Sequence, residues 1–298
     1  MLYKQIISNK RKTKLLVLLF CVLVILVGSS IGYLLNGNVY RGLVISIVFL
    51  LVYIPFTYFT ASKQILSMAG AKAASEVDYP ELFNVVEELS ISARIPVPEV
   101  YIVEDPSPNA FATGLSPEKG IVAVTSGLLG LLNREELEAV IGHEIAHIKN
   151  YDIRLSTLSI SLVSVIVFLS EIGYRILFMN DNEYSNRRSD RNILLVFLSL
   201  FLVIFSPIIA QMIRFAISRN REFLADATAV ELTRNPEGLI NALRKISSSN
   251  LSVKNANRAT ASLYISSPFK EKGSCFLNFD LFSTHPSIEE RIKRLSMM

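Results

Sequence analysis

Residues 133–150 read NREELEAVIGHEIAHIKN, and the interpretation of the whole chain starts from this stretch. Asn133, followed by Glu136, predicts a capping box at the start of a helix. Apolar residues then recur at helical spacing and predict a buried face, formed by Leu137, Val140, Ile141 and Ile145. His143 and His147 stand four positions apart, so they lie on one face of this helix.

His143, Glu144 and His147 form a His-Glu-x-x-His pattern. Two neutral imidazoles at this spacing can both reach one Zn²⁺ ion, and the carboxylate beside the metal can take a proton from a bound water. The pattern therefore predicts a zinc site with Glu144 as general base. An ordinary amphipathic helix is the alternative interpretation.

A catalytic zinc ion needs a third protein ligand while its fourth position stays open for water. The candidate is Glu222, which is followed by Asp226 four residues later on a predicted helix. One carboxylate would bind the metal, and the other would accept a hydrogen bond from a ligand histidine. A solvated helix face is the alternative, because a Glu-x-x-x-Asp pair is common by itself.

The composition predicts that part of the chain lies in lipid. Hydrophobic residues make up 51% of the 298 residues and charged residues only 19%, which is too apolar for an ordinary soluble domain. Stretches long enough to cross a bilayer occur at residues 15–35, 42–59, 155–179 and 193–217. The first is longer than the apolar region of a signal peptide and has no small-x-small cleavage site after it, so we expect it to be retained.

Basic residues cluster before the first apolar stretch and predict a cytoplasmic N-terminus. They are Lys4, Lys10, Arg11, Lys12 and Lys14. Their placement indicates topology and not nucleic-acid binding, so we expect no nucleic-acid partner. If all four stretches span, the hairpin made by the third and fourth returns the chain to one surface, where His147 and Glu222 can meet. Cys21 and Cys275 offer neither a disulfide framework nor a thiolate metal site.

Two polar blocks separate and follow the apolar stretches. In the first block, residues 79–94 predict an amphipathic helix that includes Ile91 in its apolar face, and the prolines after it end the helix. Short strands are predicted at residues 99–103, 109–113 and 120–125, which would make a small sheet. The second block begins as a helix and becomes rich in serine and asparagine at 247–267, where we expect a mobile loop.

Four motifs together resemble the HtpX-type membrane metalloproteases, which are bacterial relatives of the CAAX prenyl proteases. They are His-Glu-x-x-His at 143–147, Arg-Glu-Phe-x-Ala-Asp at 221–226, Pro-Asn-Ala-Phe-Ala-Thr-Gly at 108–114 and Thr-His-Pro-Ser at 284–287. The motifs occur in the family's order, and the resemblance covers essentially the whole chain. It implies a mainly α membrane protein with four transmembrane helices and a cytoplasmic α+β, zincin-like metalloprotease domain that contains a small β-sheet.

The apolar stretches and polar blocks divide the chain into four parts, and the resemblance implies the role of each part. The expected parts are an N-terminal membrane hairpin at 1–60, the first part of the catalytic domain at 61–154, a second membrane hairpin at 155–217 and the second part of the catalytic domain at 218–298. Zinc ligation by His143, His147 and Glu222 is implied, with Glu144 as general base and Asp226 behind the ligands.

Two further roles follow only from the resemblance. His285 and Arg291 are expected to stabilise the tetrahedral intermediate; the alternative is that His285 caps a helix at 287–295 and Arg291 is a surface charge. Asn109, Ala110 and Phe111 are expected to form a sheet edge where an extended substrate adds as a further strand. The alternative for these three residues is a purely structural strand.

The expected function is a membrane-bound zinc endopeptidase with one Zn²⁺ per chain. Its substrates would be unfolded or membrane proteins, in quality control and stress response. The resemblance places it in the bacterial inner membrane as a multi-pass protein in contact with the lipid bilayer, with the N-terminus and catalytic domain in the cytoplasm. A large prenyl-protease chamber is not expected, because that needs more membrane helices.

Three alternatives remain at the level of sequence. A zinc hydrolase acting on a non-peptide substrate would use the same site chemistry. A membrane transporter is motivated by Glu171, Arg175 and Arg214, which lie in or beside apolar stretches where charges are expensive. A non-catalytic membrane scaffold would usually have lost the base or one of the ligands, and here all of them are present.

Overall fold

The computed structural model describes residues 2–178, 201, 205, 220–249, 251–254, 260–266 and 286–298. The chain divides into two compact units. One unit consists of Met1–Lys10, Ala61–Thr157 and Ile217–Met298, and the other of Arg11–Thr60 and Leu158–Ala216. The predicted fourth membrane stretch, 193–217, lies outside the described residues, apart from residues 201 and 205.

Two long apolar helices open the chain, α1 (Leu2–Asn36) and α2 (Val39–Ala69). Within them, Ile6–Tyr33 and Val39–Ala69 are long and apolar enough to cross a membrane. The helices approach each other closely where Gly32 meets Gly42, since a Cβ on Gly32 would lie 2.6 Å from the Gly42 Cα. Small residues of this kind let membrane helices pack backbone to backbone. The first two predicted stretches thus coincide with a helical pair.

Helix α6 (Asp152–Phe178) covers the third predicted stretch, 155–179, except for its last residue. Its crossing of a membrane, and therefore the count of four spans, stays a prediction. Glu171 lies in this helix, whereas the side chain of Arg175 is outside the described part of the structure.

The unit formed by Met1–Lys10, Ala61–Thr157 and Ile217–Met298 contains a four-stranded mixed sheet in the order β1-β2-β4-β3. Its strands are β1 (Ala71–Ala73), β2 (Glu99–Val103), β3 (Ala110–Thr113) and β4 (Ile121–Thr125). β2 and β4 are parallel, while β1 and β3 pair antiparallel with their neighbours. Three strands were predicted from the sequence, whereas β1 has only three residues and no pattern by which it could be recognised.

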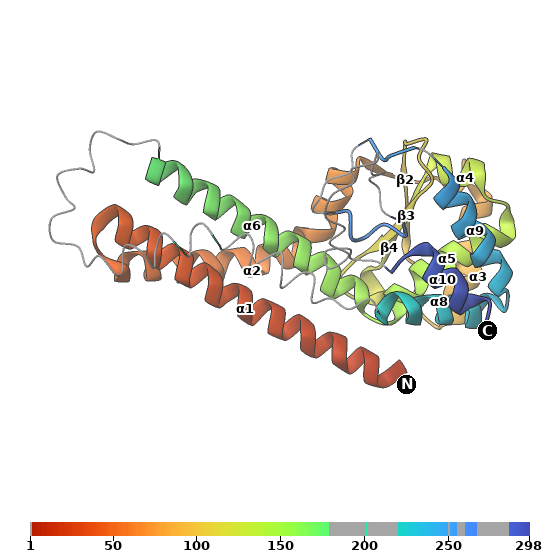
Figure 1. Ribbon diagram of the computed structural model, residues 1–298, viewed down its shortest axis with the longest axis horizontal. Coiled ribbons are helices and arrows are strands. Elements are labelled where there is room, and N and C mark those ends of the chain that lie inside the picture. The colour runs from red at the N-terminus through yellow and green to blue at the C-terminus, as the bar shows by residue number, and fades with distance from the viewer. Residues whose placement is uncertain are drawn as a thin grey trace. The chain divides into compact units, whose positions relative to one another are not determined.

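Helix α5 (Arg134–Lys149) is the centre of this unit. It packs against β3 and β4 and against three further helices (Figure 1). These are α3 (Pro80–Ala93), α8 (Asn220–Thr233) and α9 (Pro236–Ser248). Two short elements precede α5, a 3-10 turn at Pro117–Lys119 and α4 (Ser126–Leu131). Near the C-terminus, α10 (Ile288–Leu295) packs on α8 and α9.

Helix α3 differs in two details from its prediction. Ile91 is 68% exposed and does not belong to the buried face, which is made by Leu82, Val85, Val86 and Leu89. The helix ends at Ala93 before either proline, because Arg94 adopts the left-handed conformation (φ 57°) and its N–H caps the last turn.

In its coarse form the predicted fold class is confirmed: a mainly helical chain with two candidate membrane spans and a small mixed sheet.

Candidate metal centre

The capping box predicted at the start of α5 is present. The Asn133 N–H donates to Glu136 Oε2 at 3.0 Å, and the Glu136 N–H donates to Asn133 Oδ1 at 2.9 Å. Lys245 on α9 adds an ion pair to the same carboxylate at 2.7 Å. These contacts fix the start of α5, and therefore the rotation at which its histidines face α8.

His143 and His147 of α5 meet Glu222 of α8. The two Nε2 atoms lie 3.2 Å apart. Glu222 Oε2 is 3.6 Å from His143 Nε2, and Glu222 Oε1 is 3.7 Å from His147 Nε2. One donor atom of each residue falls within 4.8 Å of the others, which is close enough to share one metal ion. The structure thus brings together the three residues expected as ligands.

A carboxylate holds the far side of each imidazole. His143 Nδ1 is 2.9 Å from Asp226 Oδ1, and His147 Nδ1 is 3.0 Å from Asp152 Oδ2. A proton held on Nδ1 by its carboxylate leaves the lone pair of Nε2 facing the common centre. Both rings are therefore oriented in the way that metal ligation requires.

Sequence reasoning missed Asp152. It lies five residues after His147, and a helical register would not place it beside the ring. Tyr151 has φ 59°, a left-handed conformation that is uncommon for a residue with a side chain. This turn ends α5 and returns Asp152 to the histidine. A polar residue next to a helix end was the only available signal.

Arg291 is 1% exposed, so its interpretation as a surface charge is wrong. Its Nε and Nη2 donate to the two oxygens of Asp226 at 2.9 and 2.6 Å. Its Nη1 donates to the Ile265 carbonyl at 2.9 Å. This guanidinium lies on the Nδ1 side of His143 and does not line the cleft, which differs from the role expected at an oxyanion. His285 lies outside the described residues.

Helix α10 begins where it was predicted, but with a different cap. The Ser287 hydroxyl accepts from the Glu290 N–H at 3.2 Å and is the N-cap. Capping of this helix by His285 is therefore corrected to capping by serine, which is a preferred N-cap residue.

The charges around His143 and Asp226 stabilise each other. Burial and the charge of Arg291 would lower the pKa of His143, but hydrogen bonds to Asp226 and Glu222 outweigh them and raise it to about 9. Burial would raise the pKa of Asp226, yet the Arg291 charge and the His143 hydrogen bond hold it at about 2. A metal ion on Nε2 competes with the imidazole proton, because ligation needs the neutral ring.

Glu144 is 1% exposed, and neither carboxylate oxygen has a hydrogen-bond partner among the residues that the structure describes. Burial raises its pKa, although the charges of both histidines act in the opposite direction. A buried carboxylate without a partner is costly and calls for an explanation. Two imidazoles and one carboxylate, with a second carboxylate that lacks a proton donor within the described residues, fit a metal ion with a bound water.

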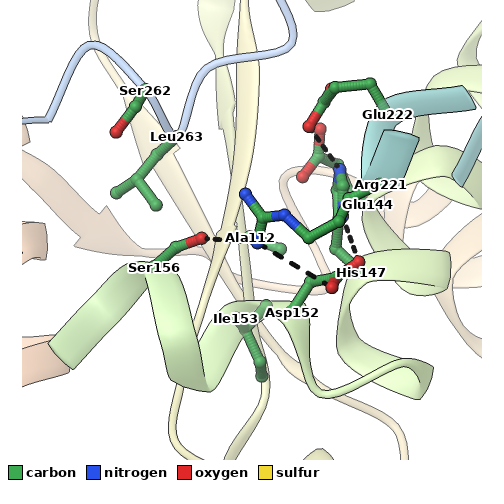
Figure 2. Close-up of a pocket in the computed structure, with 10 residues that line it drawn as sticks. All are labelled: Ala112, Glu144, His147, Asp152, Ile153, Ser156, Arg221, Glu222, Ser262 and Leu263. Carbon is green, nitrogen blue, oxygen red and sulfur yellow. Dashed lines mark hydrogen bonds and ion pairs between the residues drawn. The ribbon is translucent and has the colours of Figure 1, made fainter. Parts of the chain in front are cut away.

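A cleft of about 290 Å³ opens beside these residues (Figure 2). It is lined by Ala112, Glu144, His147, Asp152, Ile153, Ser156, Arg221, Glu222, Ser262 and Leu263. Arg221 is the only arginine or lysine among these lining residues, and its guanidinium points toward the middle of the group. Sequence reasoning used Arg221 as part of a motif and for the membrane orientation, and did not predict that it faces the cleft.

Most of the predicted substrate edge is already paired. Ala110 accepts a main-chain hydrogen bond from Ile265 at 3.0 Å, and Asn109 Nδ2 donates to the Ser266 carbonyl at 3.0 Å. Phe111 is 2% exposed, and its main chain pairs with β4. The three expected residues thus support the strand and the 260–266 segment, and Ala112 is the residue of β3 that lines the cleft.

The geometry defines a metallopeptidase site of the His-Glu-x-x-His type, in a chain with long apolar helices. The chain belongs to peptidase family M48, whose model matches residues 77–298. It is similar over 100% of both chains to proteins named Protease HtpX homolog, with 48% identity in Lactobacillus acidophilus, 48% in Listeria monocytogenes and 46% in Streptococcus gordonii. Among solved structures, Ste24p of S. mikatae is 21% identical with a TM-score of 0.47, covering 89% of this chain and 63% of that chain.

The family resemblance predicted from the motifs is therefore confirmed, and the chain is a membrane metalloprotease. The transporter and scaffold alternatives are not favoured, because the family and the potential metal site both belong to a hydrolase.

Proposed function

We propose that this protein is a zinc-dependent endopeptidase of the bacterial inner membrane that cleaves unfolded or membrane-inserted polypeptides. The observation that carries the proposal is the shared centre of His143, His147 and Glu222 beside Glu144, whose carboxylate has no hydrogen-bond partner in the described part of the chain. We further propose four membrane spans, with the N-terminus in the cytoplasm. The unit of Met1–Lys10, Ala61–Thr157 and Ile217–Met298, here called the catalytic unit, would lie on the same side. The basic residues before the first span support this orientation.

His143, His147 and Glu222 would hold one zinc ion, leaving a position for water. When bound, zinc supplies an acidified water and polarises the scissile carbonyl. Glu144 then has the task of removing the water proton and passing it to the leaving amine. Its raised pKa, caused by burial, suits a group that must both accept and release a proton near neutral pH.

Asp226 and Asp152 hold the two ligand rings, and Arg291 positions Asp226. The two hydrogen bonds from Arg291 leave Asp226 no freedom to turn away from His143. We assign Arg291 this positioning role in place of direct contact with the reacting carbonyl, because its three nitrogens contact Asp226, the Ile265 carbonyl and, at 3.4 Å, His143 Nδ1.

A substrate strand would dock at Ala112. The carbonyl of Ala110 points away from β4, since it accepts from the Ile265 N–H. The direction of main-chain groups repeats every second residue along a strand, so the N–H and C=O of Ala112 also point away from β4. An extended peptide paired there would cross the cleft beside Glu144. Main-chain pairing reads few side chains, which fits a peptidase of broad specificity for unfolded chains.

Arg221 would donate to a substrate carbonyl oxygen in this cleft. It is 7% exposed, and its Nε has no hydrogen-bond partner among the described residues. Its Nη1 makes a long contact with Ser156 Oγ at 3.4 Å and an ion pair with Asp152 Oδ1 at 3.8 Å. A guanidinium has five N–H donors, so several remain for a substrate oxygen and for negative charge that develops on it.

The deciding experiment compares detergent-purified wild type with Glu144→Gln and a matched control, Glu135→Gln, on the exposed first turn of the same helix. Each protein should hold about one zinc ion per chain. Casein cleavage should fall roughly 10²- to 10⁴-fold in Glu144→Gln alone, because the general base is removed. Equal cleavage by wild type and Glu144→Gln, or absence of zinc, would overturn the proposal; zinc binding without casein cleavage would favour a non-peptide substrate.

A further inference from the structure

The N-terminal end of α1 reaches the metal centre. Asn9 is fully buried and belongs to the same compact unit as the ligands. Its Nδ2 donates to Asp152 Oδ1 at 2.6 Å and to the Asn150 carbonyl at 2.9 Å. The next residue, Lys10, lies 4.3 Å from the centre of the Tyr151 ring. Residues 9 and 10 therefore contact the turn that joins α5 to α6.

Asp152 is the link between this turn and the ligands. Its Oδ2 holds His147 Nδ1 at 3.0 Å, while its Oδ1 receives the Asn9 amide. Arg221 Nη1 is 3.8 Å from the same Oδ1, too far for a hydrogen bond. Among the described residues, Asn9 is thus the side chain that donates a hydrogen bond to the oxygen of Asp152 turned away from His147, and Arg221 adds an ion pair at longer distance. The carboxylate itself is 1% exposed.

We propose that Asn9 is a positioning residue of the metal centre, acting through Asp152 on His147. A buried carboxylate oxygen that loses its donor pays the desolvation penalty and turns to find another partner. Asp152 would then release His147 Nδ1, and the ring would no longer aim Nε2 at the shared centre. An asparagine suits this task, because a neutral amide fixes Asp152 without neutralising it. The inference rests on the proposed role of His147 as a metal ligand.

The consequence is that the segment before the first apolar stretch belongs to the active centre. Basic residues there set topology. Asn9 adds a second role, because it helps to hold the metal ligand His147 through Asp152 when the end of α1 contacts the turn between α5 and α6. A protein whose residues 1–10 are displaced should hold its metal more weakly, even though every ligand is present.

The test is a double-mutant cycle on the full-length protein in detergent, read as zinc affinity in competition with a chelator. Asn9→Ala should raise the Kd for zinc about tenfold in the wild-type background, the lower end of the effect of losing an outer partner of a ligand. In Asp152→Ala, the same Asn9→Ala change should alter the Kd by less than about twofold, because the group through which Asn9 acts is gone. Asp152→Leu, which also lacks an oxygen that could accept from Asn9, provides a second background if Asp152→Ala does not fold.

Lys10→Ala is the matched control, since it loosens the same turn without touching Asp152. It should leave the zinc Kd within about twofold of the wild-type value. The inference is overturned if Asn9→Ala leaves the Kd unchanged, if it has the same effect in both backgrounds, or if Lys10→Ala has an equal effect. A wild-type protein that binds no zinc would instead overturn the proposed function, and this inference with it.

Discussion

Arg221 and Arg291 lie near the same centre, but their surroundings support the different roles that we propose for them. Arg221 faces the cleft with donors to spare, whereas Arg291 is buried behind His143 and bonded to Asp226 and Ile265. Their distance from the ligands in sequence does not separate these roles. The hydrogen bonds of each guanidinium do separate them. A guanidinium whose N–H donors are used by protein groups orients those groups, whereas one with N–H donors left over can bind a ligand.

Removing Arg291 should damage the protein more than the reaction. Arg291→Ala leaves the buried Asp226 carboxylate without its partner, which typically costs about 3–5 kcal/mol. We expect a large fall in melting temperature and loss of bound zinc in the same variant, measured by thermal unfolding and metal analysis. A variant that keeps its stability and zinc but loses turnover would show that Arg291 acts on the reacting carbonyl instead.

Removing Arg221 should do the reverse. Arg221→Ala should keep the zinc ion and the melting temperature, but lower kcat/KM for a peptide substrate roughly 10- to 100-fold, the value of a hydrogen bond from a charged donor, about 1.5–3 kcal/mol. Arg244→Ala, an exposed arginine on α9, is the control. Loss of zinc from Arg221→Ala would indicate that its contact with Asp152 matters more than substrate binding.

Residues whose partners are set by helical spacing could be predicted from the sequence. His143 and His147 share a face because four positions make about one turn, and Glu222 stood out through its motif. Asp152 and Asn9 could not be found, since their roles depend on a left-handed turn at Tyr151 and on a hydrogen bond across 143 positions. No local pattern encodes either feature.

At the scale of elements, α5 and α8 must pack closely for the ligands to meet. A Cβ on Gly142 of α5 would lie 3.6 Å from Ala229 of α8, so small residues face each other here. The sequence predicted both helices but not this contact, because periodicity gives the buried face of a helix and not its partner. The same limit explains the edge strand: its residues were predicted, but its pairing with residues 265 and 266 was not.

Enlarging Ala229 should therefore separate the ligands. Ala229→Leu puts a larger side chain into a fully buried position, which typically costs about 1–3 kcal/mol, and it should weaken zinc binding by moving Glu222 away from α5. Ala227→Leu, at a half-buried position of the same helix, is the control. Chelator competition measures the zinc affinity, and unchanged affinity in Ala229→Leu would mean that the helices adjust without moving the site.

The edge strand allows a test of substrate docking that leaves the metal alone. Ala112→Pro removes an N–H that points away from β4, so the sheet keeps its ladder while a docked peptide loses a hydrogen bond. We expect zinc content to stay the same and KM for casein to rise roughly 2- to 10-fold, since one main-chain hydrogen bond is worth about 0.5–1.5 kcal/mol. Phe111→Pro, whose N–H faces β4, should instead destabilise the fold. An unchanged KM in Ala112→Pro would place the substrate elsewhere.

At the scale of the whole molecule, both ends of the α1–α2 pair belong to the catalytic unit. Residues 2–10 form the first turns of α1 and residues 61–69 the last turns of α2, and both segments belong to this unit. A chain that leaves this unit through α1 and returns to it through α2 must cross a bilayer twice or not at all. The basic residues before the first apolar stretch support the cytoplasmic side that we propose for this unit.

This topology predicts opposite labelling of two exposed positions. Tyr40, just after the turn between α1 and α2, is 79% exposed, and Glu76 lies in an exposed stretch of the catalytic unit. In a background where both native cysteines are serine, a membrane-impermeant thiol reagent added to intact cells, stripped of any outer barrier, should label Tyr40→Cys and not Glu76→Cys. Lysis should make Glu76→Cys reactive as well. Labelling of Glu76→Cys before lysis would reverse the orientation, and protection of both until lysis would mean that the α1–α2 pair does not cross the membrane, whatever its length and hydropathy.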